Sequence, residues 1–387
     1  MARTLRVGMV GCGYMGKAHS NAWRQAPCFF PLKAHVELHT ICGRNSAKVQ
    51  AARAQLGWET AATDWREIVE SPLIDIVDVC TSNDSHAEIA IAAARAGKHV
   101  LCEKPLALNV KQTEAMLAAA QKAKVVHMVC HNYRRVPAIA LARKMIVEGA
   151  LGEIYHYYAR YAQESLVDPE YPLKWRLQKD ISGSGAHGDI NSHLIDLGRY
   201  LVGEFKEVCG LLHTFIKERP LMDQTGRTQS QAAKGVCKTG LVTVDDAALF
   251  LGRFESGALA NLEATRYALG RKNHIEIEIN GSKGSLFFDF EDMNRLKFFD
   301  SACPPDRRGF RDILVLQPDG SHPYVDRWWR AGHPLGYEHT FVHTMADFVN
   351  ACVDGKPVHP TFEDGLKNQR VLEAVEQSAK TGRWVKL

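Results

Sequence analysis

The chain has 387 residues, of which 45% are hydrophobic and 24% charged, as in a globular protein too long for one typical core. Its formal net charge is only +4 and its basic residues are scattered, which argues against a nucleic-acid-binding or membrane-binding surface. The first residues lack the apolar core of a signal peptide, no apolar run reaches membrane-spanning length, and the ten cysteines form no CxxC pair. We therefore expect a cytoplasmic, two-domain protein with free thiols.

Strand and helix patterns alternate through the first third of the chain. The strand at Leu5–Val10 leads into a glycine turn and a helix, and "VELHTICGRN" is a second strand before an alanine-rich helix. Further strands in "DIVDVC", "HVLC" and "VVHMVC" are separated by two more helices, the first capped by Gly97. This order predicts an α/β domain over residues 1–131, a Rossmann doubly wound parallel sheet with helices on both faces.

From about residue 152 longer strand-like runs dominate, separated by turn signals such as "ESGA" and "NGSKGS". Helices are expected after Gly188, at "HTFVHTMADFVNACVDG" and at "EDGLKNQRVLEAVEQSAKTG", and a long loop at 219–242. Residues 132–387 are therefore predicted to form a C-terminal α+β domain with a large, mostly antiparallel open sheet. This domain is expected to bind substrate and to mediate oligomerisation.

The first chemical motif is the glycine turn G-C-G-Y-M-G at 11–16. Gly11 permits the tight turn, Gly13 lets a pyrophosphate approach the backbone, and Gly16 lets the helix pack closely on the strand. With the intervening Tyr14 and Met15, this turn is predicted to bind the phosphates of a dinucleotide.

The end of the second strand lacks the acidic residue that binds the ribose hydroxyls of NAD. Gly43 and Arg44 stand there instead, and an arginine can accept the 2′-phosphate of NADP. Arg44 could equally stack on the adenine or be a solvated surface residue. We predict NAD as the cofactor, with NADP not excluded.

Two further motifs carry titratable groups. Lys104, in "CEKPLA", lies at the C-terminal end of a predicted strand, where doubly wound sheets bind ligands. Asp189 and His193, in "GDINSHLIDLGRYL", lie four positions apart on one face of a predicted helix. Taken alone, the pair could also be a polar helix entry without a catalytic role.

Taken together, "GCGYMG", "TSNDSHAEIAIAAARAGKHVLCEKPLA" and "GSGAHGDINSHLIDLGRYL" resemble the glucose–fructose oxidoreductase/inositol dehydrogenase (Gfo/Idh/MocA) family of NAD(P)-dependent oxidoreductases over essentially the whole length. Within it, "PLKWRLQKDISGSGA" and "EATRYALGRKNHIEIEINGSKGSLFF" resemble the levoglucosan dehydrogenase and glycoside 3-dehydrogenase subgroup.

The resemblance implies roles for particular residues. Lys104, Asp189 and His193 match the catalytic residues. The loop residues Thr81, Ser82, Asn83 and His86 match cofactor contacts, as do Glu103 and Asn132 at the nicotinamide end. Trp175 and Arg176 match residues that reach the cofactor or sugar, and Tyr133 and Gln163 fall among expected substrate contacts.

The chemistry of the residues agrees with these roles. Oxidation of a secondary alcohol needs a base, for which histidine is suited near neutral pH, and a positive charge such as that of Lys104 stabilises the developing alkoxide. We expect a sugar or glycoside dehydrogenase acting on a pyranose hydroxyl, at carbon 3 of a glucoside or anhydrosugar. The alternatives are an NAD-dependent glycoside hydrolase that oxidises its substrate transiently, an inositol dehydrogenase, and a non-catalytic NAD(P) sensor.

Three further expectations concern other parts of the molecule. The seventeen histidines show no HExxH or similar spacing, so no metal is predicted. His187 is expected to be a loop residue, and "RWWRAGHP" at 327–334 is either a sugar platform or a packing or subunit-contact segment. A homo-oligomer, as a dimer, tetramer or hexamer, is predicted because the second sheet carries apolar residues on both faces.

Overall fold

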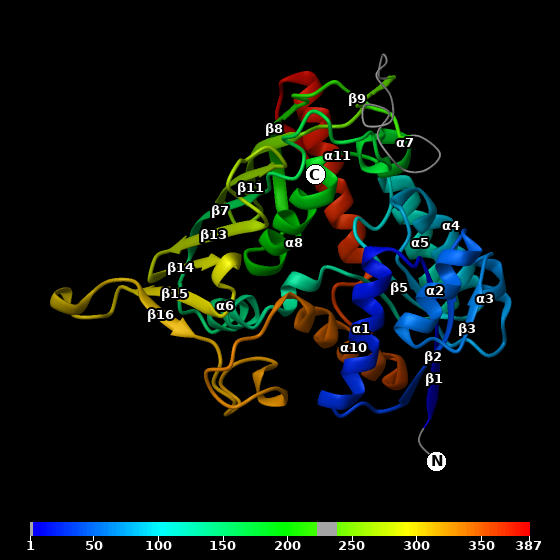
Figure 1. Ribbon diagram of the computed structural model, residues 1–387. Helices are drawn as coiled ribbons and strands as arrows, with labels where there is room; N and C mark the ends of the chain where they lie inside the picture. The colour runs from blue at the N-terminus through cyan, green and yellow to red at the C-terminus, as the bar shows by residue number, and fades with distance from the viewer. Residues whose placement is uncertain (1–2, 223–237) are drawn as a thin grey trace. The chain divides into compact units, whose positions relative to one another are not determined.

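The computed structural model describes residues 3–222 and 238–387 of the chain (Figure 1). It contains two compact units. Unit 1 comprises Met1–Ala140 and Leu316–Gln369, and unit 2 comprises Leu141–Val315 and Arg370–Leu387. The units therefore do not coincide with the predicted division at residue 131, because residues 316–369 pack with the N-terminal part of the chain.

Unit 1 is built on a six-stranded parallel sheet with the strand order β3-β2-β1-β4-β5-β6. Its central strand β4 is buried along its whole length, as expected for a strand covered by helices on both faces. The strands are β1 (Thr4–Val10), β2 (His35–Cys42), β3 (Thr60–Ala62), β4 (Ile76–Val79), β5 (His99–Cys102) and β6 (His127–Val129). The helices are α1 (Tyr14–Phe29), α2 (Ser46–Leu56), α3 (Arg66–Glu70), α4 (Asn83–Arg95), α5 (Val110–Ala123) and α10 (Tyr337–Asp354).

Two apolar clusters hold unit 1 together. In one, Trp23 of α1 and Phe341 and Phe348 of α10 pack with residues of β1, and in the other α3, α4 and α5 pack with β4 and β5. The predicted α/β architecture is thus confirmed. Sequence periodicity did not reveal the short β3 and α3, nor that α10 completes this layer.

The segment "RWWRAGHP" belongs to the first of these clusters. Trp328 lies 4.4 Å, centroid to centroid, from Phe29 of α1 and donates a hydrogen bond of 2.7 Å to His343 of α10. Of the readings left open for it, packing is the one that the structure supports for Trp328.

Unit 2 is built on a nine-stranded sheet with the order β16-β15-β14-β13-β7-β12-β11-β8-β17. All its pairings are antiparallel except that of β7 with β12. The strands are β7 (Ile154–Ala162), β8 (Phe205–His213), β11 (Ala247–Phe254), β12 (Leu259–Thr265), β13 (His274–Gly281), β14 (Gly284–Asp289), β15 (Arg295–Asp300), β16 (Arg311–Leu314) and β17 (Val385–Lys386). The large, mostly antiparallel sheet was predicted correctly.

Short helices and a small second sheet complete unit 2. Helices α7 (Lys179–Ser182) and α8 (Ser192–Leu201) belong to it, whereas α6 (Pro137–Val147) and α11 (Phe362–Thr381) run from one unit's residues into the other's. Strands β9 (Glu218–Pro220) and β10 (Thr239–Leu241) pair where a continuous loop was expected at 219–242. The middle of that loop, 223–237, lies outside the described residues.

Helix α8 packs against the sheet at a glycine. A Cβ atom added to Gly198 would lie 3.0 Å from the Tyr157 ring of β7, and the Tyr157 hydroxyl donates a 2.8 Å hydrogen bond to the Leu194 carbonyl. The tight contact fixes the helix that carries His193.

Candidate active site

The glycine turn has the geometry that a dinucleotide needs. Gly11 has φ +113°, which is unfavourable for other residues, and a Cβ there would collide with the Cys80 carbonyl. A Cβ at Gly16 would likewise collide with the Gly11 carbonyl, so helix and turn pack as predicted. Gly13, the N-cap of α1, has no atom within 4 Å of the position of a Cβ. The exposed backbone at a helix N-terminus fits a pyrophosphate.

The residue after β2, Gly43, lies too close to the glycine turn to carry a side chain. A Cβ at Gly43 would lie 2.7 Å from the Cys12 sulfur, so this position and the second residue of the turn fit each other. Arg44 is exposed and Asn45 caps α2 by accepting the Lys48 amide. The side chain that is accessible beyond this strand is therefore a cation instead of the usual carboxylate.

The loop between β4 and α4 contains four predicted cofactor residues. Ser82 is the N-cap of α4, and the Thr81 hydroxyl accepts a 2.7 Å hydrogen bond from Ser85. Asn83 and His86 are buried, and the His86 ring lies 3.0 Å from the Pro105 carbonyl and 3.2 Å from the Thr81 carbonyl. Burial lowers the pKa of His86, and the ring braces the loop through its contacts with the two carbonyls.

Lys104 and Glu103 lie directly after β5, at the carboxyl end of the sheet, where a doubly wound fold binds its ligand. Lys104 is partly exposed and Glu103 is buried. The Lys104 amide donates to Glu103 Oε2 at 3.1 Å.

Asn132 and Tyr133, which follow β6, are both buried. The Asn132 amide donates to the Thr340 hydroxyl of α10 at 2.8 Å.

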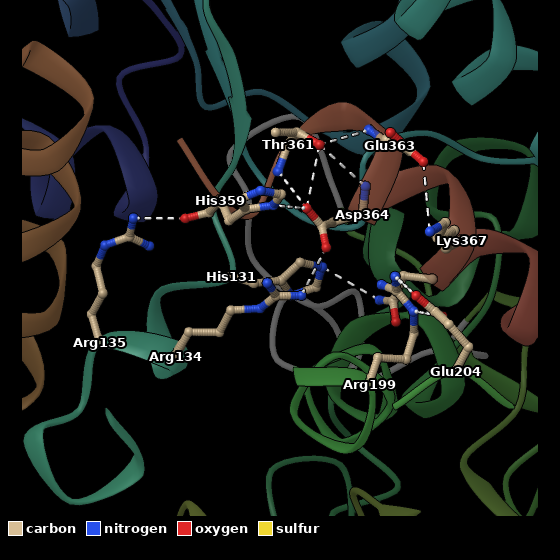
Figure 2. A network of polar contacts seen from close by, with 11 residues as sticks. His131, Arg134, Arg135, Arg199, Glu204, His359, Thr361, Glu363, Asp364 and Lys367 are labelled. Carbon is tan, nitrogen blue, oxygen red and sulfur yellow. Dashed lines mark hydrogen bonds and ion pairs between the residues drawn. The ribbon is translucent and has the colours of Figure 1, made fainter. Parts of the chain in front are cut away.

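Polar contacts anchor this segment within unit 1, as Figure 2 shows around Asp364. Asp364, at the start of α11, accepts hydrogen bonds from the Thr361 amide at 2.8 Å and from Arg134 at 3.3 Å. Arg135 donates to the His359 carbonyl at 2.9 Å. The backbone that carries Asn132 and Tyr133 is therefore held from both sides.

In unit 2, Asp189 lies in a π-helical turn, His187–Asn191, and His193 lies in the first turn of α8. The carboxylate of Asp245 fixes the start of the turn by accepting the amides of Gly185 and His187, both at 2.7 Å. A Cβ at Gly185 would collide with the Asp245 carbonyl. A helix was expected after Gly188, and the structure begins it with a π-helical turn at His187.

His187 is fully buried, and its ring lies 3.0 Å from the Leu372 carbonyl. It is therefore a buried part of the π-helical turn and not the loop residue that was expected.

Asp189 lines a small pocket within unit 2. Arg266, which is buried, lies 3.6 Å from Asp189 Oδ2 and supplies its counter-charge. The pocket is lined by Gln163, Ser165, Leu166, Tyr171, Lys174, Arg176, Leu177, Asp189 and Arg266. Amide, hydroxyl and charged groups converge there, as recognition of a polyhydroxyl ligand requires. The structure thus brings Gln163 and Arg176 together with Asp189.

Trp175 and His193 are not among the residues that line this pocket. Arg176 lies over the Trp175 ring at 4.3 Å. His193 is buried, and its ring lies 6.1 Å from that of Tyr161, whose hydroxyl shares the Asn273 side-chain oxygen with Gln163. Asn273 thus links Gln163 by hydrogen bonds to Tyr161, whose ring lies next to His193.

Sequence reasoning missed Asp245 and Arg266. Each is more than 50 residues from Asp189 along the chain, and no local motif marks either. The available signal was a charged residue at the boundary of an otherwise apolar strand, in "TVDDAALF" and "LEATRYA".

Two family models match the chain. One, described as an oxidoreductase family with an NAD-binding Rossmann fold, matches residues 5–131, and the other, the GFO/IDH/MocA C-terminal domain, matches residues 139–287. A levoglucosan dehydrogenase from Pseudarthrobacter phenanthrenivorans is 43% identical over 99% of this chain and 98% of that protein. The chain belongs to the Gfo/Idh/MocA family.

Two solved structures superpose on this chain over nearly its whole length. An oxidoreductase domain protein from Kribbella flavida is 53% identical with a TM-score of 0.93, covering 99% of both chains. A levoglucosan dehydrogenase in complex with NADH and levoglucosan is 43% identical with a TM-score of 0.93, covering 100% of this chain and 99% of that one.

Membership of the Gfo/Idh/MocA family makes the protein an oxidoreductase with an NAD-binding Rossmann fold. The glycine turn described above is the part of unit 1 suited to hold NAD. Within the described residues, no helix is both long and apolar enough to span a membrane.

Proposed function

We propose that the protein is an NAD-dependent dehydrogenase that oxidises a secondary hydroxyl of a pyranose, at carbon 3 of a glucoside or of an anhydrosugar such as levoglucosan. The observation that carries this proposal is the polar pocket around Asp189. Similarity to a levoglucosan dehydrogenase over 99% of the chain supports the same substrate class.

Each residue of the proposed site has a distinct role. NAD, when bound, supplies the acceptor for the hydride. His193 removes the hydroxyl proton as general base, and Lys104 stabilises the developing alkoxide with its charge. Asp189, held by Arg266, accepts a hydrogen bond from a sugar hydroxyl and helps to orient the substrate. Gln163 donates to another hydroxyl.

The remaining predicted residues complete the proposal. The Gly11–Gly16 turn, Gly43 and Arg44 bind the phosphate and adenosine side of NAD, whereas Thr81, Ser82, Asn83, Glu103 and Asn132 shape the nicotinamide side. The sugar is contacted by Trp175, Arg176 and Tyr133. His86 is reassigned as a residue that braces the loop, because its buried ring faces two carbonyls.

A screen of sugars with NAD and NADP, followed by absorbance of the reduced cofactor, tests the proposal. Levoglucosan and glucosides are expected to give net reduction, with myo-inositol as the comparison for the inositol dehydrogenase alternative. Turnover of myo-inositol alone would reject a pyranose substrate.

The glycoside hydrolase alternative makes a different prediction, namely cofactor retained through purification and aglycone release without net NADH production. Net production of NADH in step with sugar consumption excludes it.

We also propose that the protein works in the cytoplasm as a homo-oligomer. The open face of the nine-stranded sheet supports the second part, because it exposes Tyr158, Leu211, Leu249, Leu251 and Leu259.

A further inference from the structure

A fully buried histidine in unit 1 lies between two carboxylates. His19, on α1, has its Nδ1 at 3.0 Å from both Asp78 oxygens and its Nε2 at 2.9 Å from Glu103 Oε1. Asp78 belongs to β4 and Glu103 follows β5, so the ring links the dinucleotide-binding helix to two neighbouring strands. None of the roles proposed above uses His19.

The contacts define the charge of the ring. Each ring nitrogen faces a carboxylate oxygen, and an imidazole that donates from both nitrogens is an imidazolium. Burial acts to lower the pKa of His19, but the neighbouring groups, Asp78 first among them, together outweigh burial and hold this pKa well above its usual range.

The neighbouring thiols stay neutral, because burial raises the pKa of Cys80 well above its usual range and that of Cys130 to about 12.

The same carboxylate that binds His19 also binds the backbone of Lys104. One Glu103 oxygen accepts from His19 and the other accepts the Lys104 amide at 3.1 Å. Asp78 is fixed in turn by Trp23, whose indole donates to Oδ2 at 2.7 Å. A continuous hydrogen-bonded path therefore runs from α1 to the lysine.

A metal ion is a poorer explanation of this cluster. His19 with Glu103 and Cys130, and His19 with Asp78 and Cys80, are close enough to ligate one. A ligated ring nitrogen would lose the proton that it donates, and the existing hydrogen bonds already occupy both ring nitrogens. A proton therefore accounts for the geometry.

We propose that His19 is a positioning residue, whose imidazolium fixes Glu103 and, through it, the backbone of Lys104 at the end of β5. The inference rests on the proposed function of Lys104 in alkoxide stabilisation. Without His19, Glu103 would turn away and Lys104 would sample orientations that do not stabilise the alkoxide, with the glycine turn unaffected.

A double-mutant cycle with His19→Gln and Lys104→Ala tests this path. If His19 acts through Lys104, His19→Gln lowers turnover by about tenfold or more in the otherwise unchanged enzyme, but by less than about threefold beside Lys104→Ala, because coupled residues are not additive. NADH affinity, measured by fluorescence, should change less than about threefold. Equal losses in both backgrounds, or a parallel loss of NADH affinity, would overturn the inference.

His343→Gln is the matched control, because it also removes a fully buried imidazole from unit 1. It is expected to alter stability and leave turnover within about threefold, since His343 contacts Arg135 and Trp328. A similar turnover loss in this variant would mean that His19→Gln acts through general loosening.

Amide hydrogen exchange gives a readout that needs no sugar. His19→Gln should speed exchange at the Lys104 amide about tenfold or more and leave strand β1 unchanged, because local openings are independent of the global one. Unchanged exchange at Lys104 contradicts the inference even where no sugar is turned over, whereas a wild-type enzyme inactive on every sugar rejects only the proposed function.

Discussion

At the scale of single residues, His193 and Lys104 are expected to act mainly in the transition state. Replacing either by alanine should lower turnover about 10²- to 10⁴-fold, the usual range for positioned acid–base groups, and leave NAD affinity nearly unchanged. Asp189→Asn should cost less if the carboxylate only orients its partners. Turnover with the best sugar is measured beside cofactor affinity for each variant.

His274→Ala provides the control in unit 2, because His274 is buried but paired with Glu276 and Asp289 on the sheet. It should retain turnover within about threefold. A His193→Ala enzyme that keeps more than about a tenth of wild-type turnover would rule out His193 as the base.

Arg44 allows a test of cofactor choice, also at the residue scale. Because it is exposed beyond β2 and no carboxylate stands at position 43, Arg44→Ala should weaken NADP binding more than NAD binding. Titration of both cofactors measures this. A wild-type affinity for NADP tenfold above that for NAD, about 1.4 kcal/mol, would make the NAD preference wrong.

At the scale of elements, the π turn before α8 depends on Gly185. Gly185→Ala should lower the free energy of unfolding by about 1–3 kcal/mol, because the new methyl group meets the Asp245 carbonyl. The turn that carries Asp189 must then shift, and a displacement of about 1 Å can cost about 10²-fold in rate.

Thermal unfolding and turnover of the purified Gly185→Ala variant measure the two effects. Gly309→Ala is the control, since a Cβ there meets no atom within 4 Å. Equal turnover in the two variants would show that the turn tolerates the displacement.

The sequence specified some elements well for a local reason. The turn at Gly11–Gly16 and the position of Lys104 at a strand end follow from short motifs with a fixed backbone requirement. Alternating strands and helices likewise defined the parallel sheet, since each element carries its own apolar periodicity.

Other features depend on contacts between distant residues and left only a weak signal in the local sequence. Asp245 anchors a turn about 60 residues earlier in the chain, and Arg266 meets Asp189 only in the folded unit. The division into units was also not predictable from local patterns, because α10 packs with α1 and β1, which lie at the other end of the chain. From sequence alone, a charged residue at the end of a strand that is exposed cannot be distinguished from one that is buried against a partner.

At the scale of the whole molecule, unit 1 should lose stability in acid. Burial lowers the pKa of His343 to about 3, and its Nε2 accepts a hydrogen bond from Trp328. Between pH 6.5 and about 3 the unfolded chain therefore binds a proton that the folded chain does not, and stability falls as pH falls.

Above pH 6.5 this histidine contributes no pH dependence. Urea unfolding from pH 7.5 to 4.5 should give a slope that is shallower in His343→Gln than in the wild type, by up to about 1.4 kcal/mol per pH unit. Identical slopes would show that another group governs acid unfolding.

The second whole-molecule prediction concerns the open face of the nine-stranded sheet. Leu249 pairs with Leu211 and Leu251 with Asn261, which in turn pairs with Tyr158, so these side chains share one face. Each of the leucines and the tyrosine is at least 42% exposed. Asn261 and Glu263, the β12 partners of Leu251 and Leu249, lie on the same face. Exposed apolar side chains gathered on one face of a sheet indicate an interface, and a second copy of the chain is the partner that the prediction specifies.

Light scattering at micromolar concentration should therefore give at least twice the chain mass of 43.1 kDa. Leu249→Glu combined with Leu251→Glu should shift the mass toward one chain, because carboxylates are depleted from the centres of interfaces. Leu269→Glu, at an exposed leucine outside the sheet, should leave the mass unchanged. A strictly monomeric wild type would exclude the interface, and a stable oligomer in the double variant would place it on another surface.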